Sequence, residues 1–222
     1  MKAMVLAAGR GERMRPLTDT LPKPLLSVGG RPLIAWHLAA LARAGIREVV
    51  VNLSWLGEKL RAALGDGAGY GVSITYSEEG PVALETGGGI QRALPLLGSD
   101  PFLVVSADVW TDIDFARVRL APDALAHLVL VPNPPHHPRG DFALESGWVV
   151  SRDSERLTYG NVGIYHPGFF AGFAAGRFPL KQPLDRGIAA GRVRGELHTG
   201  AWWDVGTPQR LADLDQRLAG LQ

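Results

Sequence analysis

The sequence predicts an α/β fold with a mixed, mostly parallel central sheet flanked by helices. Through the first two thirds of the chain, short apolar segments alternate with segments whose apolar residues recur at helical spacing. The apolar segments lack the polar–apolar alternation of a half-solvated sheet, so helices are expected on both faces. A chain of 222 residues, 46% of them hydrophobic, can bury such a core without disulfides or a structural metal.

The order of the elements follows from local signals. The first strand is expected at residues 2–8, where an apolar run leads into a glycine-containing loop. The first helix, residues 32–44, has a proline at its start and a glycine just after its end. The same rhythm predicts further strands and helices in alternation, at 48–53 (strand), 55–64 (helix), 72–76 (strand), 88–97 (helix) and 101–106 (strand).

After about residue 125 the rhythm changes to shorter strands joined by turns, more antiparallel in character. Strands are expected at residues 126–131, 142–145, 148–151 and 157–165, and helices near 182–190 and 208–218. No linker, repeat or low-complexity tract interrupts the sequence. We therefore expect one domain over residues 1–222, whose two halves share one sheet.

Composition excludes several classes of function. The absence of cysteine rules out thiol catalysis, cysteine-based zinc sites and disulfides. The formal net charge is +1, so no overall field attracts nucleic acid or an anionic membrane. No uncharged apolar stretch approaches the roughly 20 residues that span a bilayer, and the apolar run at the start is too short for a signal peptide. We expect a soluble, cytoplasmic protein.

The most informative segment is the loop after the first strand. Its glycines leave backbone N–H groups open to close approach, and it carries three arginines and, further on, Lys23. N–H groups and cations together bind polyphosphates. The loop is not a Walker A sequence, because the required glycine spacing before Lys23 is missing. It is not a dinucleotide fingerprint either, because Met14 replaces the third glycine and the next strand ends in Asn52 instead of an acid. The alternative is a turn with solvated charges.

Two aspartates are candidates for metal binding. Asp108 directly follows a buried strand, so it should lie at the carboxyl edge of the parallel strands, where open α/β folds bind ligands. A carboxylate there can hold Mg²⁺ together with phosphate oxygens, although a cap or turn is the alternative. Asp204 is not needed as a helix cap, because Thr207-Pro208 already begins the last helix. A buried carboxylate needs a partner, either a metal ion or an arginine.

Two further clusters leave alternatives open. Gly87-Gly88-Gly89 could let a helix backbone approach a flat group such as a base, or could form a flexible turn. His136 and His137 are adjacent and lack the spacing of metal ligands, so polar surface is the favoured interpretation. No Gly-x-Ser-x-Gly elbow occurs, which argues against a hydrolase triad.

Together these segments resemble the sugar-1-phosphate nucleotidylyltransferases. The opening signature is Leu6-Ala7-Ala8-Gly9-x-Gly11-x-Arg13-Met14-x-Pro16-Leu17-Thr18, followed by Pro22-Lys23-Pro24. The likeness continues through Leu84-Glu85-Thr86-Gly87-Gly88-Gly89-Ile90, Asp108-Val109-Trp110, Asn133-Pro134-x-His136-His137-x-x-Gly140-Asp141-Phe142 and Trp203-Asp204-Val205-Gly206-Thr207. This fuller set is similar to one branch, the N-acetylmuramic acid α-1-phosphate uridylyltransferases of peptidoglycan recycling.

The resemblance implies a Rossmann-like nucleotidyltransferase fold, with a nucleotide half at about 1–112 and a sugar-binding half at about 113–222. The nucleotide-binding residues that it implies are Ala8, Gly9, Gly11, Glu12, Arg13, Arg15, Lys23, Glu79 and Gly88, the last facing the base. The implied sugar contacts are Ser106, Asp141 and Asn161, the Mg²⁺ ligands Asp108 and Asp204, and the catalytic residues Arg13, Lys23 and Asp108. Ser106-Ala107 departs from the family, which often has Asn-Gly there.

The implied reaction converts a sugar 1-phosphate and UTP into a UDP-sugar, here UDP-N-acetylmuramic acid, and pyrophosphate. The attacking phosphate oxygen is already ionised near neutral pH, so no general base is needed, and the usual base–nucleophile pairs are missing. A muramate substrate also predicts a cation for its lactyl carboxylate, for which Arg139, His136 and His137 are candidates.

Several alternatives remain open at this point. The same chemistry could act on glucose or mannose 1-phosphate, or use dTTP or GTP. A non-catalytic nucleotide sensor could keep the fold, although such a module would not need Lys23, Asp108 and Asp204 together. We expect no nucleic acid or membrane partner, and either a monomer or a homodimer.

Overall fold

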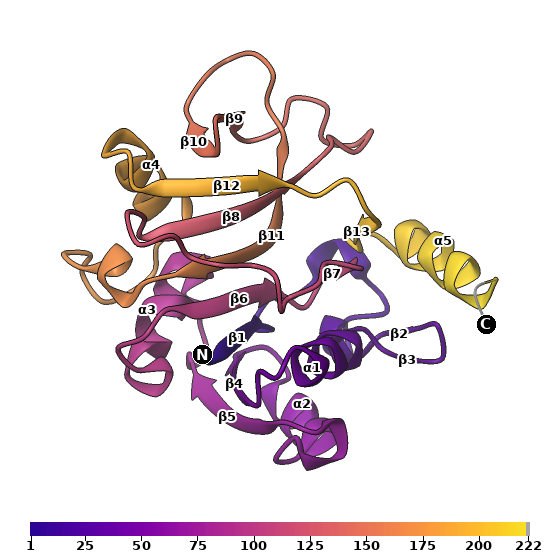
Figure 1. The fold of residues 1–222 in the computed structure, drawn as a ribbon. Coiled ribbons are helices and arrows are strands. Elements are labelled where there is room, and N and C mark those ends of the chain that lie inside the picture. The colour runs from indigo at the N-terminus through magenta and orange to yellow at the C-terminus, as the bar shows by residue number, and fades with distance from the viewer. Residues whose placement is uncertain (221–222) are drawn as a thin grey trace.

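The computed structural model describes residues 1–220 (Figure 1). Its helices are α1 (Leu33–Arg43), α2 (Gly57–Leu64), α3 (Glu85–Leu97), α4 (Lys181–Ala189) and α5 (Pro208–Ala219). Its strands are β1 (Ala3–Leu6), β2 (Ser27–Val28), β3 (Arg31–Pro32), β4 (Glu48–Leu53), β5 (Ser73–Glu78), β6 (Phe102–Ser106), β7 (Val109–Thr111), β8 (Ala126–Val131), β9 (Ala143–Glu145), β10 (Trp148–Val150), β11 (Thr158–Tyr165), β12 (Val193–Leu197) and β13 (Trp202–Asp204). Short 3-10 helices lie at Glu12–Met14, Lys23–Leu25, Ala68–Tyr70 and Pro167–Phe170. None of the helices in the described part of the chain is long and apolar enough to cross a membrane.

A nine-stranded sheet forms the middle of the molecule, in the order β5-β4-β1-β6-β11-β8-β12-β10-β9 (Figure 1). The first four strands in this order are parallel to one another. β11 runs antiparallel to both β6 and β8, so it joins the two halves of the chain into one sheet. The fold class predicted from the sequence, a mixed sheet flanked by helices, is confirmed.

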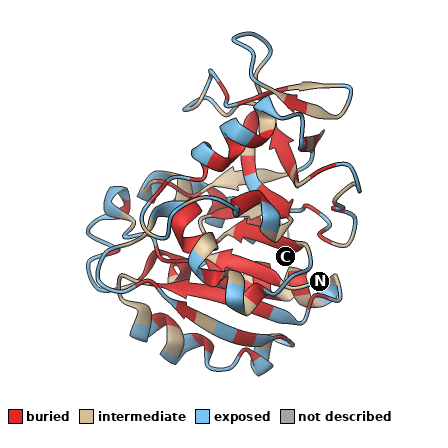
Figure 2. Cartoon of the chain, turned by 90° about the vertical axis from the view of Figure 1, so that its left-hand side faces the viewer, coloured by how far each residue is buried: buried red, intermediate tan, exposed pale blue. Residues whose placement is uncertain are grey.

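The two faces of the sheet pack against different helices, because side chains alternate along each strand. Ala3 and Val5 point into the layer of α1 and α2, where they meet side chains such as Leu38. Met4, between them, points into the layer of α3 and α4 and packs with side chains such as Ile90. Burying both faces makes the central strands almost wholly buried (Figure 2).

A ribbon of two antiparallel strands, β7 and β13, forms a separate small sheet. A third apolar cluster, which includes Met14, Val205 and Leu214, packs this ribbon and the loop after β1 against α5. α5 begins as the sequence predicts, with the Thr207 hydroxyl accepting a hydrogen bond from the backbone N–H of Arg210 (3.3 Å). This cluster holds the last helix of the chain against the loop after β1.

Three departures from the expected elements bear on the site. α3 begins at Glu85 instead of residue 88, so the three glycines lie inside its first turns. β7 is only three residues long, too short for a periodic pattern. β12 is a strand that the sequence pattern does not predict, because Gly195 interrupts its apolar residues. A Cβ at Gly195 would lie 2.8 Å from the Val149 side chain, so the glycine is required by packing across the sheet.

Candidate functional site

The loop after β1 is held in one shape by its own contacts. Gly11 adopts a left-handed backbone (φ +64°), and a Cβ there would lie 3.0 Å from the Thr18 side chain. The Thr18 hydroxyl donates to the Gly11 carbonyl (2.8 Å), and the N–H of Met14 donates to the same oxygen (2.8 Å). Because Met14 is fully buried, it anchors the loop to the core. Gly11 is therefore required by both conformation and space.

A cavity of about 650 Å³ opens at the carboxyl ends of β1, β4, β5 and β6, above this loop. Sequence-predicted residues that line it are Ala8, Gly9, Gly11, Glu12, Arg13, Lys23, Glu79, Ser106 and Asp108. The structure thus brings most of the predicted nucleotide-binding residues to one place, at the sheet edge where open α/β folds bind ligands. We refer to it as the first cavity.

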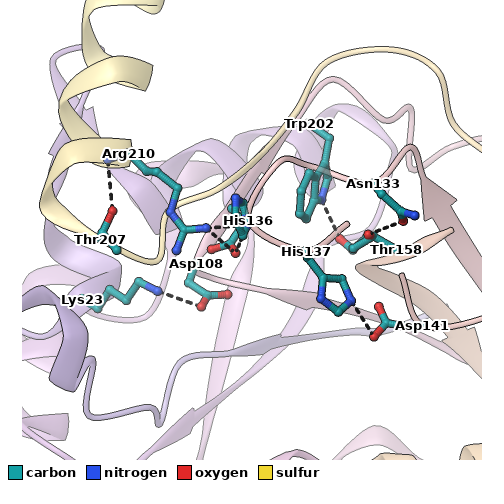
Figure 3. A network of polar contacts seen from close by, with 12 residues as sticks. Lys23, Asp108, Asn133, His136, His137, Asp141, Thr158, Trp202, Thr207 and Arg210 are labelled. Carbon is teal, nitrogen blue, oxygen red and sulfur yellow. Dashed lines mark hydrogen bonds and ion pairs between the residues drawn. The ribbon is translucent and has the colours of Figure 1, made fainter. Parts of the chain in front are cut away.

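Lys23 and Asp108 form an ion pair in this cavity, although they are far apart in sequence. The Lys23 Nζ lies 2.8 Å from Asp108 Oδ2 (Figure 3), and the Ser106 hydroxyl donates to Asp108 Oδ1 (2.7 Å). Burial opposes the charge on Asp108, but the Lys23 ammonium and the hydrogen bonds from Lys23 and Ser106 outweigh it and hold the pKa of this carboxyl below its ordinary value. Asp108 is therefore an ionised carboxylate with a fixed orientation.

Asp204 is brought beside Asp108 by the β7–β13 ribbon. Asp204 lies opposite Val109 in the strand register, and the N–H of Val205 donates to the Asp108 carbonyl (2.9 Å). The Asp204 carboxylate contacts Arg210 Nη1 (3.0 Å) and His136 Nε2 (3.1 Å), and Figure 3 shows Arg210 reaching toward His136. An arginine partner, one of the two possibilities drawn from the sequence, is thus present.

The two carboxylates fit a magnesium ion that is shared with substrate phosphates. Asp108 and Asp204 supply hard oxygen donors from neighbouring backbone positions, and each is neutralised in this structure by a cationic side chain. Within residues 1–220, no group of three or more acidic, histidine or cysteine side chains could form a metal cage. Mg²⁺ at nucleotide sites commonly uses one or two carboxylates and completes its shell with phosphate oxygens and water. This donor set matches that pattern.

A buried polar chain forms the wall of the first cavity. The Asn52 side-chain oxygen accepts from the N–H of Ala7 (2.7 Å), and its amide donates to Glu79 Oε1 (2.6 Å). The other oxygen of Glu79 accepts from the N–H of Leu84, at the start of α3 (2.7 Å). The ends of β1, β4 and β5 are thereby tied to α3. Sequence reasoning used Asn52 only to exclude a dinucleotide site and did not assign it this role.

Gly88 and Arg15 do not line the first cavity as the structure describes it. A Cβ at Gly88 would lie 2.1 Å from the Gly176 carbonyl, and one at Gly87 would lie 2.5 Å from the Phe178 ring. The helix backbone therefore approaches the protein's own 176–178 segment, which gives the glycines a packing reason. Contact between Gly88 and a base stays a prediction that this placement does not support. Arg15 is exposed and pairs with Asp19 (3.1 Å).

A second cavity of about 750 Å³ adjoins the first and shares Arg13 and Thr86 with it. Predicted residues that line it are Asp141, Asn161 and Asp204, and both His136 and His137 line it as well. His137 Nε2 lies 3.0 Å from Asp141 Oδ1 (Figure 3), and the other Asp141 oxygen accepts from the N–H of Tyr159 (2.8 Å). Both histidines are polar and partly exposed, and each contacts a carboxylate that lines this cavity.

Sequence reasoning also missed Arg210. It lies one turn into α5, and its guanidinium pairs with Asp204 in a half-buried position. The expectation that Asp204 needs a partner could have pointed to Arg210. An arginine six residues later, on the first turn of the helix that follows, was the nearest candidate along the chain.

Comparison with known proteins gives consistent results. A family model described as nucleotidyl transferase matches residues 2–142. The N-acetylmuramate α-1-phosphate uridylyltransferase of Neisseria meningitidis serogroup B is 54% identical, over 99% of both chains. The enzyme of that name from Caulobacter vibrioides is 36% identical, over 98% of this chain and 96% of its own length.

A similar fold occurs among solved structures. A Bacillus anthracis protein described as a glucose-1-phosphate thymidylyltransferase, crystallised with sucrose, superposes with a TM-score of 0.85. The alignment covers 100% of this chain and 94% of that one, at 20% identity. This likeness supports the fold, while the family model and the two full-length relatives carry the assignment. The chain belongs to the nucleotidyl transferase family, among its sugar-1-phosphate nucleotidyltransferases.

Proposed function

We propose that this protein transfers the uridylyl group of UTP to N-acetylmuramate α-1-phosphate, giving UDP-N-acetylmuramate and pyrophosphate. The observation that carries the proposal is the 54% identity, over 99% of both chains, to a relative of that named activity. The geometry supports it independently: two adjoining cavities meet at Arg13 and Thr86, as two substrates that react with each other require. We assign UTP to the first cavity and the sugar phosphate to the second.

The chemistry demands little covalent help from the protein. A phosphate oxygen of the sugar phosphate attacks the α-phosphorus of UTP, and the bond from that phosphorus to the pyrophosphate oxygen breaks. The nucleophile is already ionised, so no side chain has to remove a proton. The main barrier is repulsion between anions, since two unit charges ~4 Å apart repel by about 4 kcal/mol at an effective dielectric of about 20.

Positive charge and fixed geometry would lower that barrier. Arg13 lies between the two cavities, where it can reach phosphates of both substrates. Lys23 projects into the first cavity from a buried stem, so it is held ready near the α-phosphate and the leaving pyrophosphate. Such preorganised cations stabilise charge that develops in the transition state without reorganising at that moment. Ser106 fixes the orientation of Asp108 and so contributes to the same arrangement.

We propose Asp108 and Asp204 as the residues that hold Mg²⁺ with the substrate phosphates. When bound, the ion neutralises phosphate charge and aligns the reacting groups. Lys23 and Arg210, which now contact these carboxylates, would then be free to turn toward phosphate oxygens. All the residues in this proposal come from one chain, so either a monomer or a homodimer can carry it.

A pyrophosphate-release assay tests the proposal. Purified protein is supplied with Mg²⁺ and UTP, dTTP or GTP, each paired with N-acetylmuramate, N-acetylglucosamine, glucose or mannose 1-phosphate. We expect the highest kcat/KM for UTP with the muramate phosphate. Preference for another pair would reassign the substrate within the same chemistry. No release with any pair would leave a nucleotide sensor, which UTP binding without turnover would identify.

A further inference from the structure

His37 is a buried titratable residue to which the proposed mechanism gives no role. It lies in the second turn of α1 and is 2% exposed. Its Nε2 donates to the backbone carbonyl of Val109, 72 positions along the chain, at 2.7 Å. Its ring stacks on Phe115, with ring centroids 6.3 Å apart and an angle of 27° between the planes. Both contacts lie on β7 or just beyond it.

The Val109 carbonyl, which accepts the hydrogen bond from His37, lies next to both candidate metal ligands in the backbone. Val109 follows Asp108 directly and lies opposite Asp204 in the register of the β7–β13 ribbon. Within residues 1–220 the ribbon is a sheet of its own without strand pairing to the nine-stranded sheet, and the Trp202 indole N–H of β13 donates to the Gly160 carbonyl of β11 (2.9 Å). Apolar packing covers it, but such packing is non-directional, whereas a hydrogen bond sets a distance and an angle.

The ring is suited to this task because it stays neutral. Burial lowers the pKa of His37 to about 4, against the hydrogen bond to Val109 and the charge of Asp108, which both raise it. A neutral ring carries one N–H, and the carbonyl acceptor places that proton on Nε2. The bond is therefore present throughout the ordinary pH range.

We propose that His37 is a positioning residue, which fixes the β7–β13 ribbon, and with it Asp108 and Asp204, relative to the loop after β1. The inference rests on the proposed function, because it assigns these two carboxylates to the reaction. His37 touches no substrate and acts only through the Val109 carbonyl. Removing a group that orients a metal ligand without touching the metal typically lowers metal affinity or activity by 10–100-fold, and we expect a loss of about that size here.

The test compares His37→Leu, which removes the donor, with His37→Gln, which keeps an N–H at similar reach. We expect His37→Leu to lower kcat by about 10–100-fold while KM for UTP changes by less than about threefold. His37→Gln should recover most of the loss. Leu41→Ala is the matched control, since it removes a buried side chain one turn along α1 that has no bond to the ribbon. It should lower the melting temperature and leave kcat near the wild-type value.

A binding measurement separates this inference from the proposed function. UTP is titrated into each variant with and without Mg²⁺ by calorimetry. We expect His37→Leu to have the wild-type Kd for UTP when Mg²⁺ is absent. Mg²⁺ should lower that Kd in the variant by about tenfold less than it does in the wild type. An unchanged Mg²⁺ effect, or a kcat loss in Leu41→Ala as large as in His37→Leu, would overturn the inference. If the wild type releases no pyrophosphate, the proposed function fails. The effect of Mg²⁺ on UTP binding, compared between the wild type and His37→Leu, still tests the role of His37. If His37→Leu does not fold, the Gln variant and the shorter His37→Asn carry the same comparison.

Discussion

The two halves of the site are built differently. Three polar side chains in the wall of the first cavity are buried and bonded: Asn52 and Glu79, bonded to each other, are 4% and 7% exposed, and Lys23, bonded to Asp108, is 8% exposed. In the second cavity the corresponding groups are half exposed: the side chains of His136 and His137 are 39% and 41% exposed, and their partners are carboxylates at the surface of the cavity.

This difference fits the substrate that we propose for each half. A triphosphate presents the same dense charge in every reaction of this kind, so a rigid, preorganised set of donors is an advantage. Sugars differ at single hydroxyl, acetamido or carboxylate groups, and exposed side chains can be replaced without leaving a buried group unpaired. The family model covers residues 2–142, which include all the lining residues of the first cavity except Gly206 and only part of those of the second. We infer that the first half carries the shared chemistry and the second half the choice of sugar.

The largest expected effect comes from the buried half. Asp108→Asn keeps the size of the side chain but removes the charge that pairs with Lys23, so we expect kcat to fall by at least about 10²–10³-fold. Circular dichroism should show an intact fold. Asp112→Asn is the control, because Asp112 is exposed and pairs with His198 away from both cavities. A near-normal rate for Asp108→Asn would remove Asp108 from the mechanism and weaken the contrast between the halves.

The buried half should also respond to pH through His37. Its folded-state pKa of about 4 lies below the ordinary value of 6.5, so the unfolded chain takes up a proton first as the pH falls. Stability from this group is therefore complete above about pH 6.5 and is lost progressively toward pH 4, by about 3 kcal/mol in total. Urea unfolding at several pH values should show this loss in the wild type. His37→Gln should show a shallower dependence, and an identical slope in both proteins would contradict the prediction.

A substitution in the second half of the site should have a smaller effect, limited to the KM for the sugar phosphate. Asp141→Asn weakens the hold on His137 while keeping an oxygen that can accept from the Tyr159 N–H. We expect KM for the sugar phosphate to rise by about tenfold and KM for UTP to stay the same. Asp114→Asn, at an exposed turn outside both cavities, is the control, because within residues 1–220 Asp114 forms an ion pair only with the exposed Arg117. A matching rise in both KM values would show that the two halves are not separable in this way.

The same contrast explains how much the sequence could predict. The long apolar strands and the glycine-containing loop have strong local patterns, so most elements of the first half and the cluster around Lys23 and Asp108 were anticipated. The ribbon was only partly anticipated, since β7 has three residues. Contacts such as Asn52–Glu79 and Arg210–His136 depend on how distant segments meet, and no local pattern encodes that. The glycines of α3 pack against the 176–178 segment, and no local pattern could reveal this because that segment lies far along the chain.

The smallest effect is expected at Arg139. The lactyl carboxylate of a muramate substrate needs a cation, and Arg139 was a candidate from its place in the histidine loop, yet it does not line the second cavity. Arg156 does line it, and its guanidinium contacts the fully exposed Asp153 and the Arg152 carbonyl, so turning inward would give up only contacts at the surface. We expect Arg139→Ala to change KM by less than about twofold for both muramate and glucosamine phosphates. Arg156→Ala should raise KM by several-fold for muramate alone. The opposite pattern would return the role to Arg139 and would mean that the loop rearranges when the sugar binds. The second half of the site would then include residues outside the second cavity of this structure.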